Sequence, residues 1–446
     1  MKVLMISLGC DKNRVDSESM LGLLYEHSYE VTDDETEADV IVVNSCCFIG
    51  DAKEESINTI LEMAQYKEYG NCKVLVVAGC LAQRYAKEIR EDIPEVDALV
   101  GTTAWEHIVE AVEAVLEGKR PDCFEDTKYL PKVQGKRIVT TGGYYSYLKI
   151  AEGCDRHCTY CVIPKVRGPY RSIPMEQLLT RARQLVEAGA RELILVAQET
   201  TLYGKDLYGE KSLAGLLKEL SKIEELHWIR LLYCYPEEID RELAECIAAL
   251  PKVCKYLDLP IQHASDRILK AMGRQTDRKK LTQTIHMLRE VIPDVALRTT
   301  LISGFPGENE EDQEELISFV KEMQFEHLGV FTYSREEDTA ADAMEGHLPE
   351  ELKEERRDAI MQCQQDITFA KKDAMVGKVV EVMIEGRIPE DDVYVGRTQG
   401  NAPDIDGYIF MEADKPRISG EFVKAKVIKS SGYDLIGEIV EDEFAE

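Results

Sequence analysis

The segment Cys154-Asp155-Arg156-His157-Cys158-Thr159-Tyr160-Cys161 places three thiols close together, with three and then two residues between them. Three thiolates spaced this way on one loop can hold three irons of a four-iron cluster. The fourth iron then has no protein ligand in this segment, and an open coordination position is typical of a catalytic metal site. The turn-rich residues 163–168 that follow can fold over such a cluster, with Lys165 and Arg167 facing a charged ligand.

Two other uses of these thiols are open on spacing alone. Zinc usually takes four ligands in two pairs, and only His157 lies nearby to complete a set. Disulfides need an oxidising compartment, which nothing else in the chain suggests. The spacing therefore favours an iron–sulfur cluster. The chain has 13 cysteines, and those that match no ligand spacing are expected to be small buried or half-buried hydrophobic residues: Cys72, Cys123, Cys234, Cys246, Cys254 and Cys363.

Short apolar strands alternate with helices on the carboxyl side of this segment. A strand at 147–151 leads into the cysteine loop, and about six βα units follow through residue 332. That number is too small for a complete eight-fold barrel, so residues 140–372 are predicted to form a partial, TIM-like (β/α)6 barrel, followed from residue 348 by a charged helix. Functional groups are expected on the loops after the strands, at the carboxyl-end mouth.

Residues 1–120 show the same alternation. Strands are expected at 2–8, 40–43, 74–78 and 98–100, with helices between them, which predicts a doubly wound parallel sheet. The first helix is expected over 16–26, with Asp16 or Ser17 as its cap. Residues 121–139, which contain proline, glycine and charged side chains, are predicted to be a linker.

Three cysteines of the N-terminal region lie just beyond three of its expected strands. Cys10, Cys46 and Cys80 are 36 and 34 residues apart, about one βα unit each. In such sheets the carboxyl ends of the strands line one crevice, so thiols that are remote in sequence are brought to one place. This repeated position predicts a second three-cysteine cluster, with Cys47 as a rival to Cys46.

From residue 379 the hydrophobic pattern changes to a period of two. Five short strands separated by Gly, Pro and Asp turns predict a small closed antiparallel barrel of the OB-like kind in residues 373–441. Such barrels often bind RNA through basic and aromatic faces. Residues 372–446, however, carry 9 Lys and Arg against 17 Asp and Glu, a net charge of −8, which argues against RNA.

The composition of the 446-residue chain limits its possible partners. A net charge of −30 repels polyphosphate backbones and favours a basic partner, although acidity can also serve solubility alone. No run of about 18 apolar residues is present, so no membrane span is expected. The first ten residues lack the pattern of a signal peptide and are expected to form a strand, which favours a cytoplasmic protein.

The aromatic residue Tyr160 before the last cysteine makes the C-x₃-C-x₂-C segment similar to that of the radical S-adenosylmethionine enzymes. The resemblance implies that Cys154, Cys158 and Cys161 hold a 4Fe–4S cluster whose open iron binds the amino and carboxylate groups of S-adenosylmethionine. It also implies that loops after the barrel strands hold the cofactor. The residues carried over on that basis are Glu199, Gln262, Ser265 and Arg298.

The whole chain resembles the methylthiotransferases, which have three domains in this order, the last called TRAM. The family pattern Asn-Ser/Thr-Cys selects Cys46 over Cys47, so the resemblance implies a second 4Fe–4S cluster on Cys10, Cys46 and Cys80. The matching segments are Gly9-Cys10-x-Lys12-Asn13, Asn44-Ser45-Cys46, Ala78-Gly79-Cys80, Glu152-Gly153-Cys154 and Gly304-Phe305-Pro306-Gly307-Glu308.

This family divides by substrate. One branch modifies an adenosine of transfer RNA, and another modifies an aspartate of the twelfth small-subunit ribosomal protein. Residues 6–18 and 260–265 are close to the second branch, although Asp11 stands where proline is expected. The acidic terminal domain favours the same choice, because ribosomal proteins are strongly basic. Transfer-RNA methylthiolation is the alternative in the same reaction class, and a non-catalytic electron carrier or RNA-binding module is the alternative outside it.

The chemistry implied by the resemblance uses two molecules of S-adenosylmethionine. One is the source of a radical that removes hydrogen from the β-carbon of the aspartate, and the other methylates a sulfur at the second cluster. The implied partners are the ribosomal protein, an electron donor such as flavodoxin or ferredoxin, and a sulfur source. Nucleic acid is not expected as the primary partner.

Overall fold

The N-terminal domain is a six-stranded parallel sheet in the order β2-β1-β3-β4-β5-β6. The computed structural model describes residues 1–446 except 133–134, 391–392, 414 and 441–446. The strands are β1 (Lys2–Ser7), β2 (Glu30–Val31), β3 (Val40–Ser45), β4 (Val74–Gly79), β5 (Ala98–Val100) and β6 (Asp122–Cys123). The helices are α1 (Asp11–Glu26), α2 (Gly50–Ala64), α3 (Tyr66–Tyr69), α4 (Cys80–Arg84), α5 (Ala86–Asp92), η1 (Trp105–His107) and α6 (Ile108–Leu116).

Helices cover both faces of this sheet, as the alternating pattern predicts. Side chains of α1 and α6 pack with one face, and those of α2, α4 and α5 pack with the other. The sheet has two strands more than expected, because β2 and β6 contain two residues each and give no periodic signal. Strand β6 lies within residues 121–139 and pairs with β5.

The first helix begins earlier than its apolar pattern indicates. Helix α1 starts at Asp11, directly after Cys10, so the prediction that Asp16 or Ser17 caps it is wrong. Asp16 instead lies inside the helix, where its carboxylate is buried and pairs with Lys149 of the central domain. Asp11 occupies the first helical position, where either proline or an acidic side chain is favourable.

The central domain is an open, six-stranded parallel sheet in the order β14-β13-β12-β11-β10-β7, which confirms the partial barrel. Its strands are β7 (Tyr145–Lys149), β10 (Glu192–Val196), β11 (Trp228–Leu231), β12 (Val253–Asp258), β13 (Ala296–Ser303) and β14 (His327–Thr332). The helices on the outside are α8 (Met175–Glu187), α10 (Leu213–Leu220), α11 (Arg241–Ala249), α13 (Arg278–Val291), α14 (Glu310–Met323) and α15 (Glu350–Asp373). Short elements at the mouth are β8 (Ala151–Glu152), α7 (Ile163–Arg167), β9 (Arg171–Ser172), α9 (Lys205–Tyr208), η2 (Pro236–Glu238) and α12 (Asp266–Ala271).

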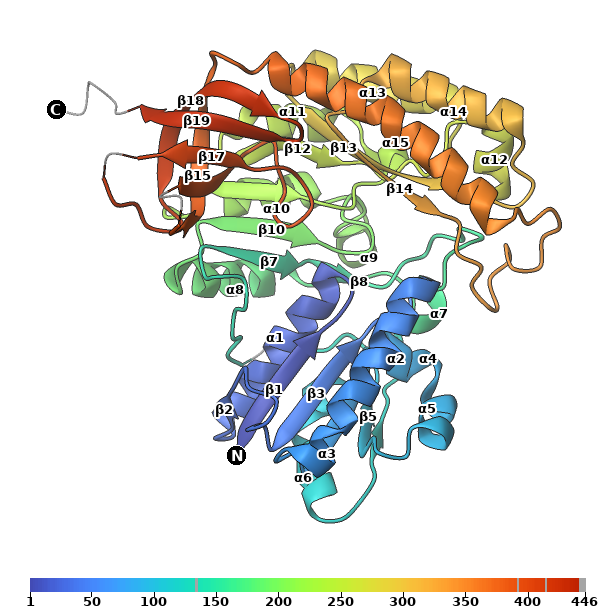
Figure 1. Ribbon diagram of the computed structural model, residues 1–446, viewed down its shortest axis with the longest axis vertical. Helices are drawn as coiled ribbons and strands as arrows, with labels where there is room; N and C mark the ends of the chain where they lie inside the picture. Colours follow the sequence, from blue (N-terminus) through green and yellow to red (C-terminus); the bar gives the residue numbers. More distant parts are fainter. Residues whose placement is uncertain (133–134, 391–392, 414, 441–446) are drawn as a thin grey trace.

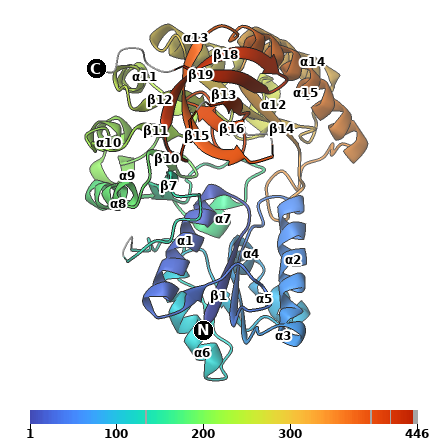
Figure 2. The ribbon, with the colours of Figure 1, turned by 60° about the vertical axis from the view of Figure 1, so that its left-hand side comes forward.

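The C-terminal domain is a closed barrel of five strands in the order β15-β16-β17-β19-β18, as the period-two pattern predicts. The expectation that it is antiparallel throughout is wrong at one place, because β17 and β19 pair in parallel. Its strands are β15 (Val379–Ile388), β16 (Val393–Thr398), β17 (Ile409–Glu412), β18 (Phe422–Ser431) and β19 (Asp434–Val440). In Figure 1 the barrel lies beside the central domain, and the N-terminal domain lies below both. Figure 2 shows the same arrangement after rotation. In the described part of the chain, no helix is both long and apolar enough to cross a membrane.

The terminal barrel is joined to the central domain through the inner face of the open sheet. Residues 399–406, between β16 and β17, enter this face, and Ala402 is fully buried in a cluster that includes Tyr147, Trp228 and Tyr256. The hydroxyl of Tyr256 donates to Asp406 at 2.8 Å. The interior of the partial barrel is therefore filled in part by the terminal domain.

A buried ion triad lies at the same junction. Oε1 of Glu192 is 2.7 Å from Nε of Arg230, and its Oε2 is 2.5 Å from Nη2 of Arg397. All three side chains have no solvent exposure. Burial alone would raise the pKa of Glu192, but the guanidinium groups of Arg397 and Arg230 outweigh it, and the pKa is held below its ordinary value.

Acid is expected to weaken this junction. Since the pKa of Glu192 is lower in the folded than in the unfolded chain, the ionised carboxylate stabilises the fold above about pH 4.3, the ordinary glutamate value. That contribution is lost as the pH falls further, through the folded pKa. The midpoint of urea unfolding, measured from pH 7 to pH 3, should fall more steeply for the native chain than for Glu192→Gln. Parallel curves for the two proteins would contradict the expectation.

Candidate active site

Cys10, Cys46 and Cys80 follow three adjacent strands, β1, β3 and β4, at the same edge of the N-terminal sheet. Cys46 and Cys80 are buried, and Cys10 is half-buried. Burial, together with the neighbouring thiols of Cys80 and Cys10, raises the pKa of the Cys46 thiol to about 12. The three side chains that the sequence predicts as one triplet are therefore brought within electrostatic reach of one another.

Two glycines allow this close approach. Gly9 has φ of +81°, and a Cβ atom there would lie 2.7 Å from Sγ of Cys46. Gly79 has φ of +87°, and its Cβ would lie 2.3 Å from Oδ1 of Asn44. Both the left-handed conformation and the lack of space require glycine directly before Cys10 and Cys80.

Cys47 also lies close to the triplet, since it shares an apolar cluster with Cys80. Its side chain is 1% exposed and packs in the apolar cluster beneath α2 and α4. Burial raises its pKa to about 12, and its electrostatic neighbours include Cys80, Arg84 and Cys46. Cys46 differs in that it interacts with Cys10 as well as with Cys80.

The second triplet occupies the loop between β8 and α7. Cys154 and Cys158 are buried, Cys161 is half-buried, and the thiols interact electrostatically with one another. Burial raises the pKa of Cys154 and of Cys161 to about 12. The sulfur of Cys158 lies 3.1 Å from the hydroxyl of Tyr235, which follows β11.

Both triplets have the donors that a 4Fe–4S cluster with one open iron requires. All thirteen cysteines are free, so no disulfide competes for the six thiols. Among the described residues, no group of three or more His, Cys, Asp or Glu side chains is close enough to bind a single metal ion. A four-iron cluster places its thiolates on different irons, so its ligands stand farther apart than those of one ion. The residues present therefore fit a cluster better than zinc.

The segment that follows the second triplet packs on the N-terminal domain through α7. Val162 and Val166 lie in the apolar cluster that contains Cys80 and Leu81 of α4. The hydroxyl of Thr102 donates to the carbonyl of Val166 at 2.8 Å. The segment directly after Cys161 thus rests against the element that begins at Cys80.

A buried network of charges continues this junction. Lys149 and Arg167 of the central domain both pair with Asp16 of α1 and with Glu152, which precedes the cysteine loop by two residues. The guanidinium group of Arg167 also donates to the side chain of Asn13 and interacts with the Cys80 thiol. Arg167 therefore faces the N-terminal triplet, whereas Lys165 donates to the carbonyl of Asp338 at 2.6 Å.

Glu199 is fully buried at the end of β10, next to the cysteine loop. Arg156, within that loop, binds it through two hydrogen bonds of 2.8 and 2.7 Å and also reaches Glu238 at 2.5 Å. Burial raises the pKa of Glu199, opposed by Arg156. A carboxylate at this point can accept hydrogen bonds from an ammonium group bound beside Cys154.

The other residues predicted to contact the cofactor lie farther along the mouth. Gln262 has φ of +70° and forms an isolated parallel bridge with Leu301 of β13. The hydroxyl of Ser265, at the start of α12, donates to Asp312 at 2.7 Å. Arg298 donates to Asp258 at 2.9 Å, and its Nε lies 3.8 Å from Asp406 of the terminal domain. Their contact with cofactor stays a prediction.

Glu199→Gln is expected to weaken the binding of S-adenosylmethionine. The amide keeps the shape of the side chain but removes the charge, which is worth about tenfold in affinity for a hydrogen bond to an ammonium group. The measurement is 5′-deoxyadenosine formation against cofactor concentration. Glu238→Gln is the matched control, since Glu238 also pairs with Arg156. Equal effects of the two variants would contradict a role of Glu199 in cofactor binding.

Tyr235, which contacts Cys158, and Arg274, which packs on Tyr235, were not identified from the sequence. The guanidinium group of Arg274 lies 4.1 Å from the ring centroid of Tyr235 and pairs with Glu237.

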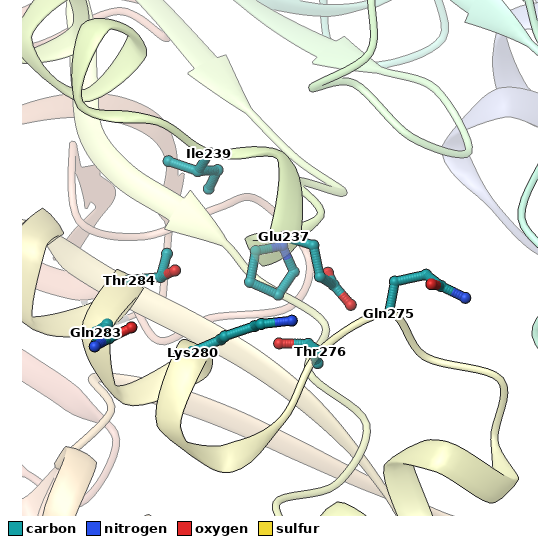
Figure 3. A pocket seen from close by; sticks show the side chains of 8 residues that line it. Glu237, Ile239, Gln275, Thr276, Lys280, Gln283 and Thr284 are labelled. Carbon is teal, nitrogen blue, oxygen red and sulfur yellow. The ribbon is translucent and has the colours of Figure 1, made fainter.

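A cavity of about 310 Å³ opens beside Glu237, between η2 and α13, where Figure 3 shows Thr276 and Lys280 in its lining. None of the ten cluster and cofactor residues predicted from the sequence lines this cavity. Single aromatic and basic residues in a loop carry no pattern that marks them beforehand.

Three family models match the chain, one to each domain. They are described as uncharacterized protein family UPF0004 (residues 2–101), radical SAM superfamily (148–320) and TRAM domain (376–440). A solved structure of the radical S-adenosylmethionine methyltransferase TsrM from Kitasatospora setae, with cobalamin and a 4Fe–4S cluster bound, is 15% identical. It covers 76% of each chain with a TM-score of 0.57, which shows likeness of fold alone.

Curated relatives match over nearly the whole length. The protein of Lachnoclostridium phytofermentans is 57% identical over 98% of this chain and 99% of its own, and that of Acetivibrio thermocellus is 50% identical over 99% of both. Each is named ribosomal protein uS12 methylthiotransferase RimO. The chain therefore belongs to the RimO family of radical S-adenosylmethionine methylthiotransferases, enzymes that use S-adenosylmethionine and 4Fe–4S clusters.

Proposed function

We propose that this enzyme replaces a hydrogen on the β-carbon of an aspartate of ribosomal protein uS12 by a methylthio group. One molecule of S-adenosylmethionine is the methyl donor and another is the radical source. The observation that carries the proposal is the packing of α7, which follows Cys161, in one apolar cluster with α4, which begins at Cys80. The names of the relatives and the acidic charge of the chain support uS12 over transfer RNA.

In this proposal Cys154, Cys158 and Cys161 hold one 4Fe–4S cluster, and Cys10, Cys46 and Cys80 hold the other. When bound, the clusters and S-adenosylmethionine supply the radical and the methylated sulfur, chemistry that no side-chain acid or base can perform. The contribution of the chain is positional. The ion pairs of Asp16 and Glu152 with Lys149 and Arg167 fix the two domains against each other, so the distance between the triplets is held.

The further partners are proposed on chemical grounds. The radical step consumes an electron, so a small reduced carrier such as flavodoxin or ferredoxin is required, and the sulfur comes from a separate source. The ribosomal substrate places the enzyme in the cytoplasm. An acidic chain of net charge −30 is suited to a basic protein substrate.

The test is mass analysis of uS12 after anaerobic incubation with the reconstituted enzyme, S-adenosylmethionine, sulfide and a strong reductant. We expect uS12 to gain one methylthio group in place of hydrogen at a single aspartate, together with release of 5′-deoxyadenosine. An anticodon stem-loop of transfer RNA, incubated in the same way, should stay unchanged. Modification of the stem-loop and not of uS12 would overturn the proposal, and absence of 5′-deoxyadenosine would exclude a radical reaction.

A further inference from the structure

Lys12 is a largely enclosed residue two positions after Cys10 of the N-terminal triplet. It is the second residue of α1, and 6% of the residue is exposed. Its ammonium nitrogen lies 3.3 Å from the ring centroid of Tyr233. Within the described residues it has no hydrogen bond or ion pair. A buried charge without an opposite charge is costly, and such groups in folded proteins are normally paired.

Neighbouring cations at the same domain junction are paired. Lys149 and Arg167 share the carboxylates of Asp16 and Glu152, and Arg298 pairs with Asp258. The nearest acidic neighbour of Lys12 in the chain is Asp11. Asp11 accepts a hydrogen bond from the hydroxyl of Tyr233 at 3.1 Å. Within the described residues it forms no ion pair with Lys12. The ammonium group of Lys12 thus contacts the face of an aromatic ring and, within the described residues, no carboxylate.

The backbone around Lys12 also favours an anion. Cys10 occupies the position before α1, and no side chain caps the helix there. The first amide N–H groups of a helix lack partners within the helix, and the helix dipole is positive at this end. The ammonium group of Lys12 and the positive end of the α1 dipole therefore both attract an anion near the start of this helix.

The position of Tyr233 connects this place with the mouth of the partial barrel. Tyr233 follows β11 with φ of +58°, an unfavourable conformation for a residue with a side chain. Its main-chain N–H donates to Asp258 at 3.0 Å. Two residues later, Tyr235 contacts the sulfur of Cys158. Tyr233 thus connects Lys12, which is two residues from Cys10, with the loop that reaches Cys158.

We infer that Lys12 binds the side-chain carboxylate of the target aspartate, an inference that rests on the proposed function. The β-carbon of aspartate is bonded directly to its carboxylate carbon, so holding the carboxylate fixes the reacting atom. The aspartate is ionised at neutral pH and supplies the opposite charge that the Lys12 ammonium group does not have within the described residues. Adenosine has no carboxylate, so the same contact selects against a nucleoside. Lys12 is a positioning residue and takes no proton in the reaction.

The test compares two peptides that carry the uS12 target loop, one with aspartate and one with asparagine at the modified position. Binding to the reconstituted enzyme is measured by fluorescence anisotropy without reductant, so no turnover occurs. The native enzyme should prefer aspartate by about tenfold to a hundredfold, the range for a hydrogen bond between charged groups. Lys12→Met and Lys12→Gln should bind both peptides within about twofold of each other, and Lys12→Arg should keep a preference for aspartate.

Lys136→Met is the matched control, since Lys136 also stacks on a tyrosine, Tyr25, at 4.3 Å, but lies away from both triplets. It should keep the native preference for aspartate. The inference is overturned if the neutral variants at position 12 still prefer aspartate, or if they lose iron, which would assign Lys12 to the cluster. A native enzyme that methylthiolates uS12 but shows no preference for the aspartate peptide would overturn the inference and leave the proposed function intact. If the native enzyme does not modify uS12, both the proposed function and the inference about Lys12 are overturned.

Discussion

Alanine at Cys10, Cys46 and Cys80 together is expected to abolish methylthio transfer to uS12 while S-adenosylmethionine is still cleaved to 5′-deoxyadenosine. The three thiols lie at one edge of the N-terminal sheet, separate from the triplet that follows β8. Removal of one triplet leaves the other intact. Iron in the reconstituted protein should fall from about eight to about four atoms per chain, as expected for the loss of one four-iron cluster.

The measurements are iron content, 5′-deoxyadenosine and the mass of uS12, all on one reconstituted sample. A variant with alanine at Cys123, Cys246 and Cys363 is the control, because these thiols lie outside both triplets. It should retain about eight irons and full transfer. Cys47→Ala tests the choice between adjacent cysteines and should likewise retain both clusters. Methylthiolated uS12 from the variant that lacks the N-terminal triplet would refute the assignment of that site.

Glu192→Ala is expected to destabilise the protein by about 3–5 kcal/mol, the usual effect of removing one partner from a buried ion pair. Glu192 lies between Arg230 of the central domain and Arg397 of the terminal barrel, and all three side chains are inaccessible to solvent. Without the carboxylate, Arg230 keeps no carboxylate partner in the described structure, and Arg397 keeps only Glu385. The two guanidinium groups would then repel each other where water cannot screen them.

Urea unfolding gives the measurement, and Glu381→Ala is the matched control. Glu381 also joins the terminal barrel to the central domain, through Trp228 and His227, but its side chain is 48% exposed. An exposed pair of this kind contributes roughly 0–1 kcal/mol. If Glu192→Ala unfolds at the same urea concentration as Glu381→Ala, the triad contributes nothing beyond an ordinary surface contact.

The sequence was most informative where residues repeat at equivalent positions. The alternation of strands and helices predicted both parallel sheets, and the placement of Cys10, Cys46 and Cys80 after successive strands predicted that they meet. Such positions can be predicted from sequence because the carboxyl ends of all strands in a parallel sheet lie at the same edge. The period-two pattern predicted the terminal barrel for a similar reason.

Contacts between domains could not be predicted in this way. Glu192 and Arg397 are 205 residues apart, and neither belongs to a periodic pattern that the other shares. Asp16 precedes an apolar run, a pattern that predicts a helix cap. The helix already starts at Asp11, however, and the carboxylate of Asp16 forms an ion pair with Lys149 of the central domain. The contact between Lys12 and Tyr233 likewise forms only because the N-terminal domain packs on the mouth of the partial barrel, so neither residue could be identified from the sequence.

The insertion of residues 399–406 into the open sheet also bears on how this protein can be divided. A truncated chain that ends after α15 would expose the aromatic residues Tyr147, Trp228 and Tyr256, which Ala402 now covers, and would be prone to aggregate. Grafting the terminal barrel of a distant relative onto this chain would require a matching loop and an arginine opposite Glu192. The last 70 or so residues are thus an integral structural part of the enzyme and not a detachable module.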